Sequence, residues 1–183
     1  ARTALTEAPP EAGITAILTG LGSLSYGELA GERMQLGLML HDPEEEHDCF
    51  ADNTHNSHYY NSVGMENVYR GRYERIDGTV LEGPALADLV AAADPDLDAE
   101  MRAKLEASLA ALGDIKSTAD SGEMAYDQMI GEDNDKGNTL VQTAIDALVD
   151  QTRTIERIVA ALDLGAIAFE GSDSLDDPEA VFQ

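Results

Sequence analysis

The chain has 183 residues and is 43% hydrophobic, which is typical of a single globular domain with a buried core. Its 36 acidic residues outnumber 11 basic ones and give a formal net charge of -25, which argues against nucleic acid and against an anionic membrane surface as partners. No apolar run reaches the roughly 18 residues that a membrane-spanning helix needs. The single cysteine excludes an internal disulfide, so Cys49 is expected either to be buried or to pair with another chain.

Residues 1–10 are expected to form a leader segment that ends at a proline pair, where a helix can begin. From Ile14 to Met39 the apolar positions recur in steps of three and four, which predicts one long helix. Glu28 and Glu32 continue this apolar stripe one turn apart. Two carboxylates held close and away from water repel each other unless a cation such as Arg33 lies between them. All three are therefore ligand-binding candidates, although a drifting stripe would instead bring both carboxylates to solvent.

Glycines are unusually frequent inside this predicted helix, although each costs about 1 kcal/mol relative to alanine in a helix interior. They permit another element to approach the helix closely, or they mark a kink. The glycines concerned are Gly20, Gly22, Gly27, Gly31 and Gly37.

A polar segment from Asp42 to Asn56 follows, because Pro43 ends the helix. This loop and the start of the next segment carry carboxylates and imidazoles, which suit iron, zinc or manganese. Glu28 and Glu32 could join them from the facing helix, since bundle cores commonly build metal sites in this way. The metal-ligand candidates are Glu44, Glu45, Glu46, His47, His55 and His58.

Two plainer interpretations of the same loop stay open. In the first, it is a solvated acidic loop whose histidines lie on the surface. In the second, it is structural, because Asp52, Asn53 and Thr54 carry groups that bond readily to nearby backbone and would lock the loop against the helices.

Apolar periodicity predicts the remaining helices. The clearest begins at Asn138, follows a four-three spacing like a coiled-coil seam, and is expected to end near Gly165. Residues 166–183 are expected to form an acidic tail that is loose after Gly171. The segments together predict an all-α fold: an antiparallel four-helix bundle over residues 11–165, with a long polar loop after the first helix. The other predicted helices cover residues 57–73, 84–93, 94–113 and, as a single turn, 124–130.

No catalytic motif is established by its spacing alone. His-Glu-x-x-His is absent, and the His41-x-x-Glu44 spacing contains Pro43, which disfavours the helix that such a motif needs. Cys49 has His47 nearby, but the surrounding acids disfavour a thiolate nucleophile. Phosphate-binding loops and the Gly-x-Ser-x-Gly motif are also absent.

Four stretches nevertheless resemble one known family. They are LTGLGSLSYGELAGER at Leu18–Arg33, EEEHDCFADNTHN at Glu44–Asn56, GMENVYRGRY at Gly64–Tyr73 and EGPALADLVAAADPDLD at Glu82–Asp98. These motifs are long and specific, and they are similar to those of the imelysin-like family, including the iron-regulated protein A group. The resemblance covers nearly the whole chain.

The resemblance implies an all-helical fold of two related bundles, exported to the periplasm or the cell surface, including the outer membrane. This chain resembles only the second bundle. An N-terminal imelysin half is therefore the expected partner, from the same precursor or as a separate chain, and a lipid anchor is expected on that half if the protein carries one. The family is classed with metallopeptidases and linked to iron uptake. Its Gly-x-His-x-x-Glu signature has no match here, since Met39 stands two residues before His41.

The resemblance also carries site residues over, motif by motif. In the family the matching positions line or support the cleft between the two bundles. Pro43 and Asp48 depart from the pattern, because relatives usually have Gln and Ser there. The matching residues in this chain are Glu32, Arg33, Glu46, His47, Asp52, Asn53 and Thr54.

We therefore expect an exported, iron-associated binding protein that contributes half of a polar cleft for a metal or a small ligand. Iron is the expected cofactor, with zinc as the alternative, and Glu46 and His47 are the metal-ligand candidates. The alternatives are a metallopeptidase of the same family and a structural bundle without a ligand. The ligand-binding candidates are Glu28, Glu32, Arg33, Asp52, Asn53 and Thr54.

Overall fold

The structure, a computed structural model, describes residues 7–182 and is mostly helical. This confirms the all-α class that the sequence predicts. The predicted leader, residues 1–10, falls mostly outside the described part of the chain, so it stays a prediction. No helix within residues 7–182 has both the length and the apolar character needed to cross a membrane.

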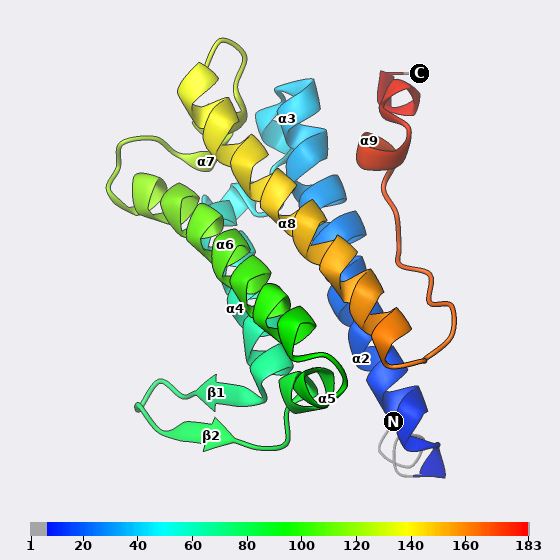
Figure 1. The fold of residues 1–183 in the computed structure, drawn as a ribbon. Helices are drawn as coiled ribbons and strands as arrows, with labels where there is room; N and C mark the ends of the chain where they lie inside the picture. The colour runs from blue at the N-terminus through cyan, green and yellow to red at the C-terminus, as the bar shows by residue number, and fades with distance from the viewer. Residues whose placement is uncertain (1–6, 183) are drawn as a thin grey trace.

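The first helical rod combines two kinds of helix (Figure 1). α2 (Pro10–Ser23) and α3 (Leu36–Leu40) are α-helical and flank η1 (Leu24–Gln35), which is a π-helix. At its end the N–H of Leu36 donates to the carbonyl of Gly31, five residues back. A π turn holds more residues than an α turn, so η1 changes which side chains face the core. π-Helical segments are rare in proteins, and those that occur are often found at functional sites.

Three further long helices complete the main body: α4 (Thr54–Arg70), α6 (Pro95–Asp120) and α8 (Asp135–Ala161). α8 packs between α6 and the first helical rod, and α4 packs on α6 (Figure 1). α6 begins where the sequence predicts, because the Asp94 carboxylate accepts hydrogen bonds from the N–H groups of Asp96 and Leu97. The core between these helices is mostly Leu, Ile, Met, Val and Ala.

The finer prediction of an antiparallel four-helix bundle is not confirmed. The first rod and α4 leave a groove between them, whose walls include Ile17 and Tyr60. Two shorter helices, α5 (Leu86–Ala93) and α7 (Tyr126–Ile130), also pack against the long ones. The main body is therefore more open and more composite than the apolar periodicity alone predicts.

A β-hairpin, which the sequence does not predict, follows α4. β1 (Arg72–Glu74) and β2 (Val80–Glu82) pair antiparallel, with Tyr73 opposite Leu81. The strands are too short to show a readable alternation. Gly78 adopts a left-handed φ of 81° at the turn between the strands, a conformation that glycine takes readily.

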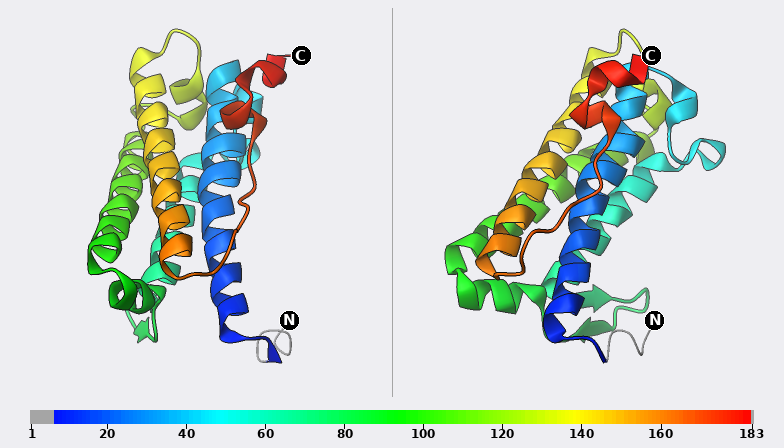
Figure 2. Two further views of the ribbon diagram at one scale, coloured as in Figure 1. Left: turned by 45° about the vertical axis from the view of Figure 1, so that its right-hand side comes forward. Right: turned by 90° about the vertical axis from the view of Figure 1, so that its right-hand side faces the viewer.

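The C-terminal segment, residues 165–176, lies along the first rod (Figure 2). It ends in α9 (Asp173–Asp176), and η4 (Pro178–Phe182) follows. Glycines of the rod make room for it: a Cβ on Gly27 would lie 2.4 Å from the carbonyl oxygen of Glu170. Ser172 and Ser174 are buried, so the start of the tail that was expected to be loose packs against the rod. The glycines do permit a close approach, but by an extended segment instead of a helix.

Candidate functional site

The loop after α3 is held in one shape by its own hydrogen bonds. His41 has a left-handed φ of 52°, and its Nδ1 lies 2.7 Å from the carbonyl oxygen of Ile130. The Asp48 N–H donates to the Thr54 hydroxyl over 3.0 Å, and the Ser57 hydroxyl donates to the Asp48 carboxylate, also over 3.0 Å. These bonds agree with a locking role for Thr54, and they fix the direction in which the loop side chains point.

Glu46 is the loop residue that points inward. Its side chain is buried, with a relative exposure of 8% for the residue, and its Oε2 has no hydrogen-bond partner within residues 7–182. Burial raises the pKa of the Glu46 carboxyl, the hydrogen bond with Thr54 opposes this, and the acids Asp127, Asp52 and Asp48 add to the rise. The site therefore holds a carboxyl group that takes up a proton, or another positive charge, more readily than an exposed glutamate.

His58 of α4 and Tyr126 of α7 meet in the core, and Tyr126 lies close enough to Glu46 to experience its charge. Their rings lie 5.1 Å apart, edge to face at 85°, and both residues are almost completely buried. Within the described part of the chain, the two ring nitrogens of His58 and the hydroxyl of Tyr126 have no hydrogen-bond partner. Burial lowers the pKa of His58 to about 3, with smaller contributions from His47, Arg33 and His55, so the imidazole is neutral. Burial also raises the pKa of Tyr126, and the Glu46 charge raises it further.

We call Glu46, His58 and Tyr126 the polar cluster. Three different elements supply it: the loop after α3, α4 and α7. A buried polar atom without a partner costs about 1–3 kcal/mol, so native proteins rarely keep several together unless a ligand or ordered water meets them. The Tyr126 hydroxyl remains neutral at physiological pH, and the neutral imidazole offers one donor and one acceptor. The cluster can therefore bind a group that both donates and accepts hydrogen bonds.

Two predicted site residues flank the polar cluster. The ring of His47 is exposed and lies 6.4 Å from the ring of His58, nearly parallel to it at 25°. Arg33 of η1 is close enough to His58 to help lower its pKa, and it forms an ion pair with Glu28. Positive charge thus lies beside the buried imidazole, without a hydrogen bond to it.

The predicted buried pair of Glu28 and Glu32 is not found. Glu32 is exposed, and the Glu28 side chain is 44% exposed and paired with Arg33. The spacing explains the error, because in a π-helix the neighbour one turn away includes residue i+5 as well as residue i+4. Their assignment as ligand-binding residues stays a prediction.

The remaining candidates lie on or near the surface. Asp52 is exposed, and Asn53 accepts a hydrogen bond from the Asn56 amide over 2.8 Å. Nε2 of His55 lies 3.4 Å from the Asp120 carboxylate, its buried Nδ1 has no partner within the described residues, and the residue is close enough to His58 to help lower its pKa. Glu44 and Glu45 are also exposed, and Cys49 is partly buried with a free thiol.

A metal site built from this chain alone does not fit. Within residues 7–182, no three side chains of the His, Cys, Asp or Glu kind are grouped so that they could hold a metal ion. The predicted metal pair is divided by burial, since Glu46 points inward and His47 is exposed. Iron or zinc would therefore need further donors from another molecule.

Sequence reasoning missed Tyr126 as a site residue and did not separate His58 from the surface histidines. Tyr126, Met129 and Ile130 stand at i, i+3 and i+4, and all three are buried. This spacing marks a buried face on the short helix α7. It could have indicated that Tyr126 is buried, but not that its hydroxyl lies near a glutamate and a histidine.

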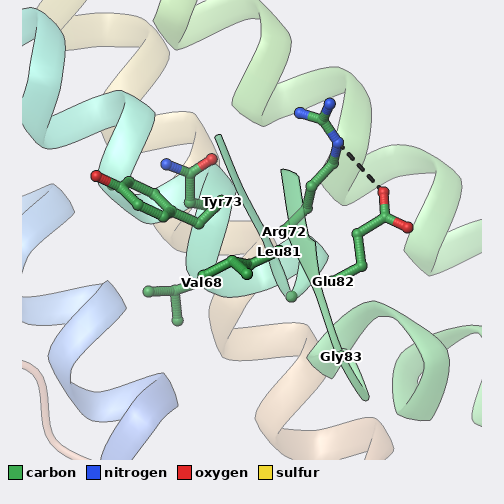
Figure 3. A pocket seen from close by; sticks show the side chains of 9 residues that line it. Val68, Arg72, Tyr73, Leu81, Glu82 and Gly83 are labelled. Carbon is green, nitrogen blue, oxygen red and sulfur yellow. Dashed lines mark ion pairs between the residues drawn. The ribbon is translucent and has the colours of Figure 1, made fainter. Parts of the chain in front are cut away.

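A hollow of about 490 Å³ at the hairpin is a different kind of surface (Figure 3). Val68, Tyr73 and Leu81 line it with mostly apolar atoms, and an ion pair of 3.3 Å joins Arg72 and Glu82 at its side. None of the predicted site residues lies there. The groups with chemical potential are therefore concentrated at the polar cluster.

Comparison with known proteins points in one direction. The model of the imelysin family, described as a peptidase family, matches residues 1–155. A search of curated proteins gave no significant match. The matched residues include the whole polar cluster.

Proposed function

Because the chain belongs to the imelysin family, we propose that it is a ligand-binding module of that family whose binding site is the polar cluster. One observation carries the proposal. Glu46, His58 and Tyr126 are buried together, and each has a polar atom with no partner within the described chain. A purely structural core would be expected to satisfy these atoms.

The chemistry of the cluster suggests the kind of ligand. Neutral His58 and the Tyr126 hydroxyl can each donate or accept a hydrogen bond, and Glu46 accepts when ionised. Arg33 lies nearby, and its positive charge favours some negative charge on the ligand. A small polar molecule with both acceptor and donor groups, or such a molecule carrying a metal ion, meets these requirements.

Iron association and export to the periplasm or the cell surface belong to this proposal through the family alone. The same holds for a partner half that completes the polar cleft. Since the described residues do not gather three metal-ligating side chains, an iron or zinc ion would arrive with donors from its own chelator or from that partner.

A second candidate function is peptide hydrolysis. The family is described as a peptidase family, and a buried carboxyl with a raised pKa, such as that of Glu46, is typical of a general acid or base. Hydrolysis of unstructured peptides that a chelator abolishes, and that is lost in Glu46→Gln, would support this candidate. An inert purified chain would remove it.

Calorimetric titration of the chain with ferric citrate, citrate alone and zinc tests the main proposal. We expect at least one probe to bind, and we expect Glu46→Gln and His58→Gln each to weaken that binding by about tenfold or more. Glu11→Gln is the matched control, because Glu11 is an exposed glutamate of α2 that belongs to none of the candidate sites, and it should bind as the unmodified chain does. If no probe binds, or if both cluster variants bind normally, the structural alternative without a ligand is favoured.

A further inference from the structure

A second hollow lies between the first helical rod, α8 and the C-terminal segment. Its volume is about 460 Å³. Figure 2 shows the C-terminal segment running along the rod from the end of α8 to α9. Part of its wall comes from residues beyond 155, outside the match to the imelysin family. The hollow is therefore separate from the polar cluster and from the function proposed for it.

The walls of this hollow are fixed by specific contacts. The N–H of Glu170 donates to the Ser23 hydroxyl over 3.0 Å. The Tyr26 hydroxyl donates to Asp176 Oδ1 over 2.7 Å, and the N–H of Ser172 donates to Asp176 Oδ2 over 3.0 Å. These bonds attach the C-terminal segment to the first rod at Glu170 and at Asp176 of α9. The space between the segment and α8 stays open and forms the hollow.

Opposite charges line the hollow. Arg153 and Glu156 stand three residues apart on α8, so they share one face, and Asp176 lies across from them on α9. Tyr26 experiences the charges of all three. The guanidinium of Arg153 is 3.7 Å from Asp150, which already has a closer partner in Lys104. Arg153 is therefore available to an incoming anion.

Apolar side chains form another part of the wall. Val149 of α8 lies one turn before Arg153, and Ile167 and Phe169 contribute from the C-terminal segment. Phe169 also packs over Gly22, where a Cβ would lie 2.4 Å from its ring, so the ring has a fixed position. The hollow thus combines one cation, two carboxylates and an apolar side.

We propose that this hollow binds a small zwitterion with an apolar side chain, either a free amino acid or a dipeptide. The Arg153 guanidinium binds the ligand carboxylate. Asp176 and Glu156 bind the ligand ammonium group. A carboxylate can accept about four hydrogen bonds, and within the described chain Asp176 accepts two, from Tyr26 and Ser172. Val149, Ile167 and Phe169 contact the apolar side chain.

Calorimetric titration with matched probes tests this assignment. The probes are L-leucine, leucyl-leucine, 4-methylpentanoate, which lacks the ammonium group, and 3-methylbutylamine, which lacks the carboxylate. We expect leucine or the dipeptide to bind, and each truncated probe to bind about tenfold more weakly or worse. Arg153→Gln should weaken the zwitterion by a similar factor.

Arg157→Gln is the matched control, because Arg157 lies one turn further along α8 and pairs with Glu100. It should leave binding unchanged. The proposal is overturned if neither zwitterion binds, if the truncated probes bind as well as leucine, or if Arg153→Gln has no effect. None of these results depends on the polar cluster, so failure here leaves the proposed function to its own test.

Discussion

Two buried polar regions of this molecule differ in whether their polar atoms have hydrogen-bond partners. In the first, the amide of Gln151 on α8 donates to the Ser25 hydroxyl of η1 over 3.1 Å and accepts from the Ser108 hydroxyl of α6. Ser25 in turn donates to the carbonyl of Leu148 over 3.0 Å. This network joins three helices, and the polar atoms of its side chains have partners. In the polar cluster, by contrast, Glu46, His58 and Tyr126 each keep an unpaired polar atom.

This difference indicates that the two regions have different roles. Satisfied buried hydrogen bonds stabilise one arrangement of helices, because breaking them leaves an unpaired group away from water. Unpaired buried groups lower stability and are retained where another molecule makes use of them. We therefore assign the Gln151 network to the fold and the polar cluster to binding.

The largest expected effect is on the network. Gln151→Ala should lower the free energy of unfolding by about 3 kcal/mol, because it removes hydrogen bonds to two serines and leaves a cavity between helices. Urea unfolding followed by circular dichroism measures this. If Gln151→Ala still folds, it should bind ligand at the polar cluster as the unmodified chain does. A decrease of less than about 1 kcal/mol in the free energy of unfolding would contradict the assignment.

Destabilisation away from both regions should leave binding intact. Gly27→Ala places a Cβ against the carbonyl oxygen of Glu170 and should lower the free energy of unfolding by about 2 kcal/mol. Gly20→Ala is the control on the same rod, because nothing lies within 4 Å of its Cβ position. It should raise stability by up to about 1 kcal/mol. Thermal unfolding of both variants checks the pair, and equal effects would refute the packed position of the C-terminal segment.

Much of the fold can be predicted from the sequence, because helical spacing is a local signal. The α8 stripe identifies a long helix within a few residues of its observed ends, and the start of α6 was also predicted, although α6 continues to Asp120, past its predicted end at residue 113. The π-helical η1 was not predictable in this way, since its hydrogen bonds depend on packing against α8 and the C-terminal segment. The packed position of the C-terminal segment was also not predictable from local spacing, because it depends on glycines more than a hundred residues earlier in the chain.

The candidate site was only partly predictable. Glu46 and Thr54 stand out because the loop is rich in polar residues, and both are buried there. Tyr126 carries no chemical signal of its own in the sequence. Its meeting with His58 results from the packing of α7 near α4, which brings together residues 68 positions apart. Glu32 reaches solvent, which is the alternative that the sequence left open, because the α-helical period does not hold across a π-helix.

Acid should distinguish the two regions through His58. Its pKa falls from the ordinary 6.5 to about 3 in the folded chain, so the unfolded chain binds a proton that the folded chain refuses. The stability contributed by neutral His58 is complete above about pH 6.5 and is lost as the pH falls toward about 3, by roughly 1 kcal/mol per pH unit. Glu46 acts in the opposite direction, because its pKa is raised and its contribution is lost as the pH rises.

Urea unfolding at about pH 7 and about pH 5 measures this slope, and His58→Gln should flatten it. His47→Gln, which changes an exposed imidazole in the same loop region, should keep the slope of the unmodified chain. The Gln151 network carries no titrating group, so Gln151→Ala should also keep it. If His58→Gln keeps the slope, a group other than His58 causes the dependence of the free energy of unfolding on pH.

The most direct test is the smallest change, Tyr126→Phe, measured twice. It removes the unpaired hydroxyl and leaves the ring against His58. Without ligand, the account predicts that the free energy of unfolding rises by about 1 kcal/mol, while ligand binding at the cluster weakens by about tenfold. If Tyr126→Phe instead lowers stability and binds ligand as before, the hydroxyl serves the fold, and the polar cluster is not a binding site.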